Sequence, residues 1–509
     1  MAENVLLGID IGTSSCKVGA FSVEGEALGT ATRPYEILRS TAYEAEQDAE
    51  EWWHAACLCI QKLLSANVFD AQDVAAIGVV GHSWATLPVD DEGTPLRNAM
   101  LWLDRRSLEE CRYLEEVVGE QYILELSGNR IDPAYCVPKM LWIRNNEPEV
   151  YAQTYKFLQS NSFIVHKLTG VFTQDASQGY GYYVFDTERR GWSWEACELM
   201  GIDGQLLPKV FESVTVVGEV TSQAAAMTGL KAGTPVVAGG VDCAGACLGA
   251  GLIEHGATQE QAGQAGGMTI VTQRPYKDSR LISGCHVIDQ YWHLSGGTVS
   301  GGVLNWFYGN ILAQNGDISS LGDEKHNPFE LLSLEAETSP VGADGLLFLP
   351  YMAGERTPIW DPLARGVLLG LSYEKNRGDL VRALMEGAAL ALRHNLEVAG
   401  QVGIKPSSLI SVGGGAKSKV WCQIKADITQ LPLGIPSLDD GTVFGAALLG
   451  GIGVDVYADW QASLQEIVGV RQWYKPREAN TSLYDELYQI YLASYAALKD
   501  QLHRLAQLG

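Results

Sequence analysis

The sequence has few basic residues relative to its acidic ones. Its 36 lysines and arginines face 61 aspartates and glutamates, which gives a formal net charge of −25 at pH 7. A nucleic-acid-binding protein needs a basic surface to neutralise phosphates, and basic clusters attract anionic membrane surfaces. The charge therefore argues against both partners. An anionic substrate is not excluded, because a few local basic groups or a metal ion can make the electrostatic potential positive at a binding site.

Long apolar runs and targeting signals are also missing. Residues 236–253 are largely apolar but contain Asp242 and several glycines, so they do not indicate a bilayer-spanning helix. The opening MAENVLLGID has neither the basic region nor the small-residue cleavage site of a signal peptide. We therefore expect a soluble, cytoplasmic protein.

The ten cysteines lack the spacing of a metal site or of a disulfide framework. Cys57 and Cys59, like Cys243 and Cys247, have no second pair at zinc-finger distance. Cys16 and the second pair lie among glycine, alanine and serine. This composition favours small, buried, free thiols.

The length of 509 residues favours two large domains, because a single core of that size is uncommon. Strand-like and helix-like stretches alternate, which predicts an α/β fold without solenoid repeats. Predicted strands include residues 5–9, 17–23, 27–32, 74–80, 99–103, 346–350 and 409–412. Predicted helices include residues 49–64, 106–118, 380–398, 441–452 and 480–508. Residues 173–182 are predicted to form a polar loop.

The first predicted strand ends in a loop that could wrap phosphate oxygens. Gly12 lets the backbone turn, Thr13 and Ser14 offer hydroxyl and N–H groups, and Asp10 and Lys17 supply opposite charges. The alternative is an ordinary turn in a β-hairpin.

A carboxylate opens a small-residue helix near the middle of the chain. Residues 236–251, VVAGGVDCAGACLGAG, predict a strand end, a Gly-Gly turn and then a helix that starts at Asp242. The helix macrodipole favours an ionised Asp242, which could accept a proton from a hydroxyl or hold a cation. The alternative role is a helix cap.

Polar residues also follow other predicted strands, where open α/β sheets bind ligands. His82, Ser83 and Trp84 follow one strand, and Asp104 follows another. His82 could instead be structural, and Asp104 could cap the next helix. Farther along, the strand at 409–412 runs into glycines and then a helix. That order predicts a nucleotide or phosphate site, because backbone can approach a ligand closely there.

Taken in order, these motifs resemble the FGGY family of carbohydrate kinases over nearly the whole chain. DIGTS with Lys17 resembles the family's first phosphate loop, and GGVDCAGA places Asp242 at its catalytic aspartate. Two family signatures resemble residues 139–146 and 366–386. The family's adenosine-binding loop resembles residues 413–418. The segments LPYMAGERTP, EQDAEEWW and WLDRR are most similar to those of xylulokinases.

The resemblance implies an α/β fold with two ribonuclease-H-like domains, of the actin/hexokinase-like ATPase type, and a cleft between them. Residues 1–245 would form the sugar-binding domain and residues 246–509 the nucleotide-binding domain. Sugar and nucleotide held by different domains react only when the domains approach, so we expect a hinge near residues 239–251.

The resemblance also implies roles for individual residues. Asp242 would be the general base, and Asp10 would hold Mg²⁺. The groups implied to bind ATP are Gly12, Thr13, Ser14, Lys17, Gly263, Gln264, Gly413, Gly414, Gly415 and Ala416. The groups implied to bind the sugar are Asp104, His82, Ser83 and Trp84.

Two departures from the family pattern bear on activity and substrate. The second phosphate loop usually reads Gly-Thr-Ser-Gly, whereas Gln264 and Ala265 occupy the middle positions here; the Gln264 amide can still donate. Xylulokinases have Met-His where this chain has Ser83-Trp84. Ala134 and Cys136 also alter the first half of the N-terminal signature.

The resemblance favours ATP-dependent phosphorylation of D-xylulose to D-xylulose 5-phosphate. Another ketose such as ribulose, a polyol, or a sugar acid such as gluconate stays open. A non-catalytic sugar or nucleotide sensor on the same fold is the alternative from another class. The implied partner is a small-molecule sugar, and a homodimer stays open.

Overall fold

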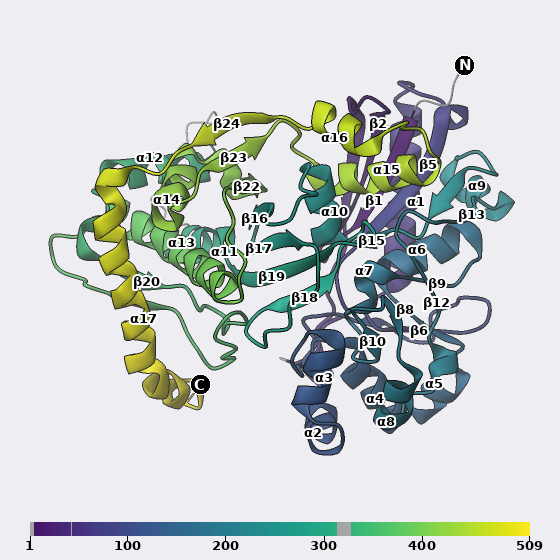
Figure 1. Cartoon of the computed structure of the whole chain (residues 1–509), viewed down its shortest axis with the longest axis horizontal. Coiled ribbons are helices and arrows are strands. Elements are labelled where there is room, and N and C mark those ends of the chain that lie inside the picture. Colours follow the sequence, from purple (N-terminus) through teal and green to yellow (C-terminus); the bar gives the residue numbers. More distant parts are fainter. Residues whose placement is uncertain (1–4, 42, 313–326, 509) are drawn as a thin grey trace.

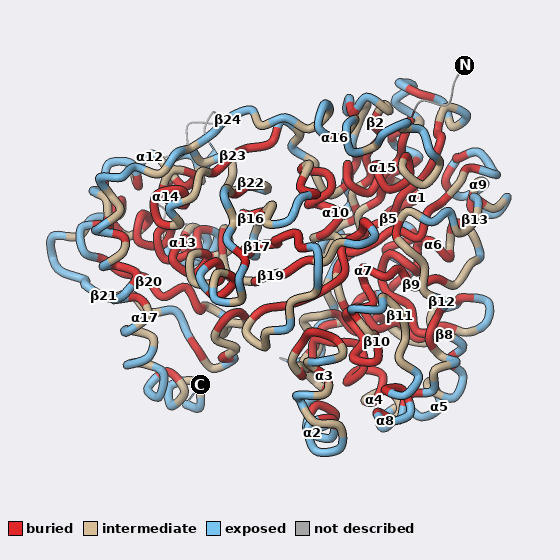
Figure 2. Tube along the Cα trace, in the orientation of Figure 1, coloured by how far each residue is buried: buried red, intermediate tan, exposed pale blue. Residues whose placement is uncertain are grey.

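The computed structural model describes residues 5–41, 43–312 and 327–508. Two seven-stranded mixed sheets organise the fold, one from each half of the chain, and helices cover them (Figure 1). Figure 2 shows that the strands and the helices against them are largely buried, whereas the connecting segments are exposed. The predicted α/β class with two sheet-centred units is confirmed. No helix within the described ranges is long and apolar enough to cross a membrane.

The first sheet has the order β13-β14-β5-β1-β2-β3, with β15 paired to β5. Its strands are β1 (Val5–Ile11), β2 (Ser15–Ser22), β3 (Ala27–Pro34), β5 (Val74–Gly81), β13 (Val216–Glu219), β14 (Pro235–Val237) and β15 (Gly240–Val241). β5 is parallel to both β1 and β15, and Gly81 is in register with Ile11 on one side and Val241 on the other. The segments that follow these three strands therefore start at the same sheet edge.

The second sheet has the order β18-β19-β17-β16-β22-β23-β24. Its strands are β16 (Thr258–Ala262), β17 (Ala265–Thr272), β18 (Ile282–Cys285), β19 (Trp292–Val299), β22 (Leu409–Val412), β23 (Leu433–Pro436) and β24 (Val470–Tyr474). β16 runs parallel to β22, with Gln261 in register with Val412. The turn after β16 and the glycines after β22 therefore lie at one edge.

The long predicted helices are present. They are α1 (Ala49–Ser65), α2 (Leu108–Val117), α13 (Arg377–Gln401), α14 (Lys419–Thr429) and α17 (Glu478–Ala506). Apolar residues of α13 recur at helical spacing and are buried. α17 runs along the outer side of the C-terminal part (Figure 1).

One helix from the second half of the chain packs on the first sheet. α15 (Gly441–Gly453) contacts β1, β5 and α10 (Asp242–Gly249). A Cβ on Gly8 would lie 1.9 Å from the Val443 carbonyl oxygen, and one on Gly78 would lie 1.9 Å from that of Ala446. Glycines on the strands thus allow the helix backbone to approach. The boundary at residue 245 stays a prediction.

The prediction of a polar loop over residues 173–182 is wrong. The segment contains β9 (Thr173–Asp175) and α7 (Ala176–Gly179), and every residue of both is buried. Several of its polar groups are hydrogen-bonded: Asp175 accepts from Ser177 Oγ at 2.6 Å and from Asn161 Nδ2 at 2.8 Å. The polar composition of this segment led us to expect an exposed loop, but buried polar groups are tolerated once they are hydrogen-bonded.

The predicted cysteine chemistry is confirmed. All ten cysteines are free, and nine of them are buried; the tenth, Cys243, is partly buried.

Candidate active site

The loop between β1 and β2 is fixed by contacts from several segments. The Tyr35 hydroxyl donates to the Gly12 carbonyl at 2.5 Å, and the Trp102 indole N–H donates to Thr13 Oγ1 at 3.1 Å. Ser14 at the tip is exposed. The loop is therefore anchored at its base with a polar tip free for a ligand, which suits the predicted phosphate contact.

Asp10 and Asp242 lie at the same edge of the first sheet, close enough for their charges to interact. Burial and the negative charge of Asp242 raise the pKa of Asp10 to about 8, while Lys17 opposes the shift. Lys17 is opposite Asp10 in the β1–β2 ladder, and its Nζ lies 2.5 Å from Asp440 Oδ1. The predicted Lys17–phosphate contact stays a prediction, because the side chain pairs with Asp440 here.

Asp242 is the first residue of α10 and does not cap it. Val241 occupies the N-cap position, and the Cys243 N–H donates to Asp242 Oδ1 at 2.6 Å. The structure thus disfavours the capping alternative. Burial raises the pKa of Asp242 to about 6, so the side chain is ionised at neutral pH. Its other oxygen accepts no hydrogen bond from the described residues and is available to a ligand.

The donor set near Asp10 suits Mg²⁺. Asp10 Oδ1 is buried and has no hydrogen-bond partner within the described ranges, a costly arrangement for a carboxylate without a ligand. Those ranges contain no group of three or more His, Cys, Asp or Glu side chains that could hold a metal. Magnesium usually keeps several waters and needs only one or two carboxylates, so Asp10 with Asp242 nearby fits.

Of the three residues after β5, Trp84 and Ser83 adjoin other aromatic groups. Trp84 has φ of 63°, a left-handed conformation uncommon for a bulky residue, and its ring stacks on Tyr135 at 4.2 Å. Its indole N–H is buried without a partner among the described residues. Ser83 Oγ lies 2.9 Å from the Tyr180 hydroxyl. Backbone strain and an unpaired donor at one residue are typical of ligand sites.

His82 fits the structural alternative better than a sugar contact. Its side chain is 1% exposed and packs edge-on against Trp52 at 5.5 Å. Burial lowers the pKa of His82 to about 4, so the ring is neutral.

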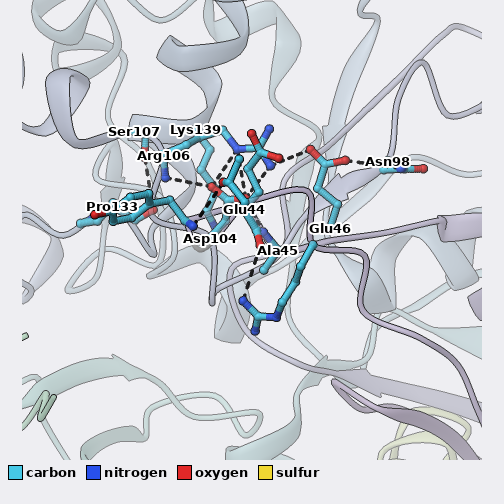
Figure 3. A network of polar contacts seen from close by, with 12 residues as sticks. Glu44, Ala45, Glu46, Asn98, Asp104, Arg106, Ser107, Pro133 and Lys139 are labelled. Atoms are coloured by element: carbon cyan, nitrogen blue, oxygen red, sulfur yellow. Dashed lines mark hydrogen bonds and ion pairs between the residues drawn. The ribbon is translucent and has the colours of Figure 1, made fainter. Parts of the chain in front are cut away.

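The prediction that Asp104 binds the sugar does not fit its placement. The residue is fully buried, and its oxygens accept from the Ala45 N–H at 2.9 Å and from Arg106 Nη2 at 2.7 Å, among other contacts (Figure 3). Arg106 also reaches Glu46 at 2.7 Å and lies over the Trp142 ring at 4.9 Å. Asp104 therefore positions Arg106 and the segment at residue 45. The strand predicted over 99–103 is only β7 (Ala99–Met100), and the turn after it directs Asp104 inward.

The two glycine-rich turns of the second half lie together. Gly413 has φ of 96°, and a Cβ on it would lie 3.2 Å from Gly263 N. Gly414 is exposed, and Gly415 and Ala416 continue in a short 3₁₀ turn. Gln264 is exposed between β16 and β17 and accepts from Asn305 Nδ2 at 3.0 Å. The Gln264 amide nitrogen is left to donate to a ligand.

Two cations that were not predicted as site residues contact Trp84 and Trp102. Lys139 is fully buried in α4 (Cys136–Asn146) and donates to the Trp84 carbonyl at 2.8 Å. Burial lowers the pKa of Lys139 to about 8. Arg356 lies over the Trp102 ring at 4.8 Å. The signal for Lys139 was a lysine in an otherwise apolar helix turn. The contact of Arg356 with Trp102 has no local signal in the sequence.

Comparisons with known proteins match one family over most of the chain. Residues 5–249 match the N-terminal domain, and residues 234–454 the C-terminal domain, of the FGGY family of carbohydrate kinases. The chain is 30% identical to a xylulose kinase of Bacillus subtilis (97% of each chain covered) and 26% identical to a gluconokinase of Bacillus licheniformis (98% and 97% covered). The solved xylulose kinase of Rhodospirillum rubrum superposes with a TM-score of 0.87 at 29% identity, covering 98% of this chain and all of that one.

Proposed function

The chain belongs to the FGGY family of carbohydrate kinases, and from that premise we propose that it transfers the γ-phosphoryl group of ATP to D-xylulose, giving D-xylulose 5-phosphate. Family membership makes the chain an ATP-dependent sugar phosphotransferase. The proposal adds the substrate, the residues and the metal. The observation that carries it is the convergence of Asp10, the Gly12–Thr13 turn and Asp242 at one edge of the first sheet, since β1, β5 and β15 are in register there.

Asp242 is the proposed general base. Its carboxylate, ionised above a pKa of about 6, accepts the proton of the reacting sugar hydroxyl as that oxygen bonds to the γ-phosphorus. The bond from the γ-phosphorus to the bridging oxygen of ADP breaks in the same step, and ADP leaves. Asp242 then releases its proton to solvent.

The other site residues position the two substrates, which is the main source of rate in phosphoryl transfer. The polar tip at Ser14 contacts phosphate oxygens, and Gln264 donates from the opposite sheet. Gly413 and the turn after it lie against adenosine. Mg²⁺, held through Asp10, would neutralise phosphate charge when bound.

Trp84 and Ser83 form the proposed wall against the sugar carbon chain, and Tyr135 packs against the Trp84 ring. An aromatic face covers C–H groups, and the free indole N–H and the serine hydroxyl offer hydrogen bonds. Xylulose is preferred because the chain is 30% identical to the xylulose kinase of Bacillus subtilis and 26% identical to the gluconokinase, each along nearly the full length. The similarity to a gluconokinase supports gluconate as the second candidate. A homodimer and a cytoplasmic location stay predictions.

A release assay for ADP over ketopentoses, ketohexoses, polyols and sugar acids tests the substrate. We expect D-xylulose to give the highest kcat/KM and the product to carry its phosphate on the terminal hydroxyl. A preference for gluconate would change the proposed substrate but not the proposed reaction. Binding of sugar and nucleotide without any sugar-dependent ADP release would identify a sensor and contradict the proposal.

A further inference from the structure

Arg356 lies in a loop of the C-terminal half of the chain that contacts Trp102 and Arg130 of the first half. It lies in the loop between β20 (Leu347–Leu349) and β21 (Val367–Leu369). Its guanidinium carbon is 4.8 Å from the centre of the Trp102 ring, and the Trp102 N–H holds Thr13 of the first phosphate loop. The same loop makes a second contact with the first half of the chain, where the Arg130 guanidinium carbon lies 5.1 Å from the centre of the Trp360 ring. Arg356 is thus held against residues of the first half.

The guanidinium has donors to spare. Among residues 5–41, 43–312 and 327–508 no acceptor lies within hydrogen-bond reach of it, and no carboxylate lies within 4.0 Å. The neighbouring Glu355 uses its oxygens elsewhere: Oε1 accepts from the Arg356 backbone N–H at 3.0 Å and Oε2 from Thr298 Oγ1 at 3.3 Å. The guanidinium is partly exposed, so a ligand that displaces water can supply acceptors for its donors.

The loop holds this unpaired cation firmly. Thr357 Oγ1 donates to the Gly297 carbonyl of β19 at 2.9 Å, which ties the backbone beside Arg356 to the second sheet. A Cβ on Gly297 would lie 2.8 Å from Arg356 Nη2, so the glycine leaves the space that the guanidinium fills. The side chain is therefore preorganised.

The groups around Arg356 belong to the sugar side of the site. The charges that act on its pKa, besides burial, are those of Arg105, Glu355, Asp132 and Tyr135. Tyr135 is the ring on which Trp84 stacks. The guanidinium is therefore close to Tyr135, and the contact of Arg130 with Trp360 places the same loop beside the segment that leads to Tyr135.

We propose that Arg356 binds a carbonyl or carboxylate oxygen of the acceptor, so that the enzyme selects a ketose or a sugar acid over the polyol of the same carbon chain. This rests on the proposed kinase function and names the chemical class that the site accepts. A guanidinium donates only, and its hydrogen bonds to an sp² oxygen of high electron density are stronger than those to an alcohol. One such charge-assisted bond corresponds to about 10- to 100-fold in affinity.

The test compares matched acceptors: D-xylulose with xylitol, and D-gluconate with D-glucitol. We expect the wild-type enzyme to prefer the first member of at least one pair by about 10-fold or more in kcat/KM. Arg356→Gln should reduce that preference to about threefold or less and raise the KM for the acceptor, with the KM for ATP within about twofold. Arg356→Lys should retain part of the preference, because it keeps the charge but not the planar fork.

Two further variants separate binding from structure. Gly297→Ala keeps the arginine but displaces its guanidinium, so the preference should fall as well. Arg365→Gln is the control, because among the described residues that guanidinium donates only to the carbonyls of Pro362 and Ala364 in the same loop. It should leave the preference unchanged.

An unchanged preference in both Arg356→Gln and Gly297→Ala would overturn the inference, as would a raised KM for ATP alone, which would assign Arg356 to phosphate. Calorimetric titration of the full chain with the same four compounds separates this inference from the kinase proposal. Binding that is lost in Arg356→Gln supports the inference even if no acceptor is phosphorylated. Failure of all four compounds to bind the wild-type chain contradicts it.

Discussion

Because α10 and α15 pack closely, adding one methyl group at Gly249 between them should lower the free energy of unfolding substantially. A Cβ on Gly249 would lie 1.8 Å from the Gly441 carbonyl oxygen and 2.8 Å from Gly445 N. Both atoms are backbone, so no side-chain rotation relieves the clash, and Gly249→Ala must push the helices apart. Overpacking of this kind costs about 1–3 kcal/mol or more. Alanine gains about 1 kcal/mol of helix propensity, which offsets only part of that cost.

The same substitution should also lower activity. Asp242 starts the helix that ends at Gly249, about 10 Å away along the axis. A shift of α10 therefore moves the proposed base relative to Asp10 and the phosphate loop. We expect a fall in kcat of about 10-fold or more, because small misplacements of reacting groups are costly.

Gly400→Ala is the matched control. Gly400 lies in α13, and a Cβ there would meet nothing within 4 Å. It should be neutral or stabilise the protein by up to about 1 kcal/mol, with unchanged kcat. Urea unfolding followed by circular dichroism, with steady-state rates on the same preparations, measures both effects. A Gly249→Ala variant as stable and active as Gly400→Ala would refute the reasoning.

Three further predictions follow from buried charges. Activity should fall as the pH drops through about 6, because the raised pKa of Asp242 leaves the base protonated below that value; a pH profile of kcat/KM that stays flat from 7 to 5 would contradict it. Arg106→Gln should destabilise the protein by about 3–5 kcal/mol by leaving the Asp104 carboxylate buried and unpaired, and adding Asp104→Asn should recover part of that loss in denaturant unfolding. Lys139→Met should cost about 1–3 kcal/mol, since the Trp84 carbonyl loses its buried donor, and an unchanged thermal midpoint would exclude this role.

Ionisation of Asp242 also makes the stability of the fold depend on pH. Its folded pKa of about 6 lies above the ordinary value of 3.8, so the folded state binds the proton more tightly. The resulting stabilisation is fully present below pH 3.8 and is lost as the pH rises through about 6. At neutral pH the ionised Asp242 is therefore retained at a cost in stability, as expected of a group kept for chemistry.

Local patterns predicted the elements of the fold well wherever periodicity was clear. The strand over 409–412 matches β22, and the helix over 441–452 matches α15 to within one residue. What the sequence did not predict was where α15 packs. That placement depends on glycines at Gly8 and Gly78, far away in the chain, and no local pattern records such a contact.

The candidate site was only partly predictable for a similar reason. Strand ends indicated Asp10, Asp242 and the turn at Gly413, because polar residues and glycines after strands mark sheet edges. Gln264 was implied by the family resemblance alone. Asp104 satisfied the same pattern, yet Arg106 two residues later holds it inward. Partners that come from distant loops, such as Arg356 at Trp102, have no local signal at all.

The central claim is that Asp242 is the base of an ATP-dependent sugar kinase, and Asp242→Asn tests it most directly. The amide keeps the shape of the side chain but cannot accept the proton. We expect kcat with the best acceptor to fall by about 100-fold or more, the usual contribution of a general base, while the affinity for ATP changes by less than about threefold. A variant that retains more than about a tenth of the wild-type kcat, with ATP affinity intact, would assign the proton to another group and contradict the account.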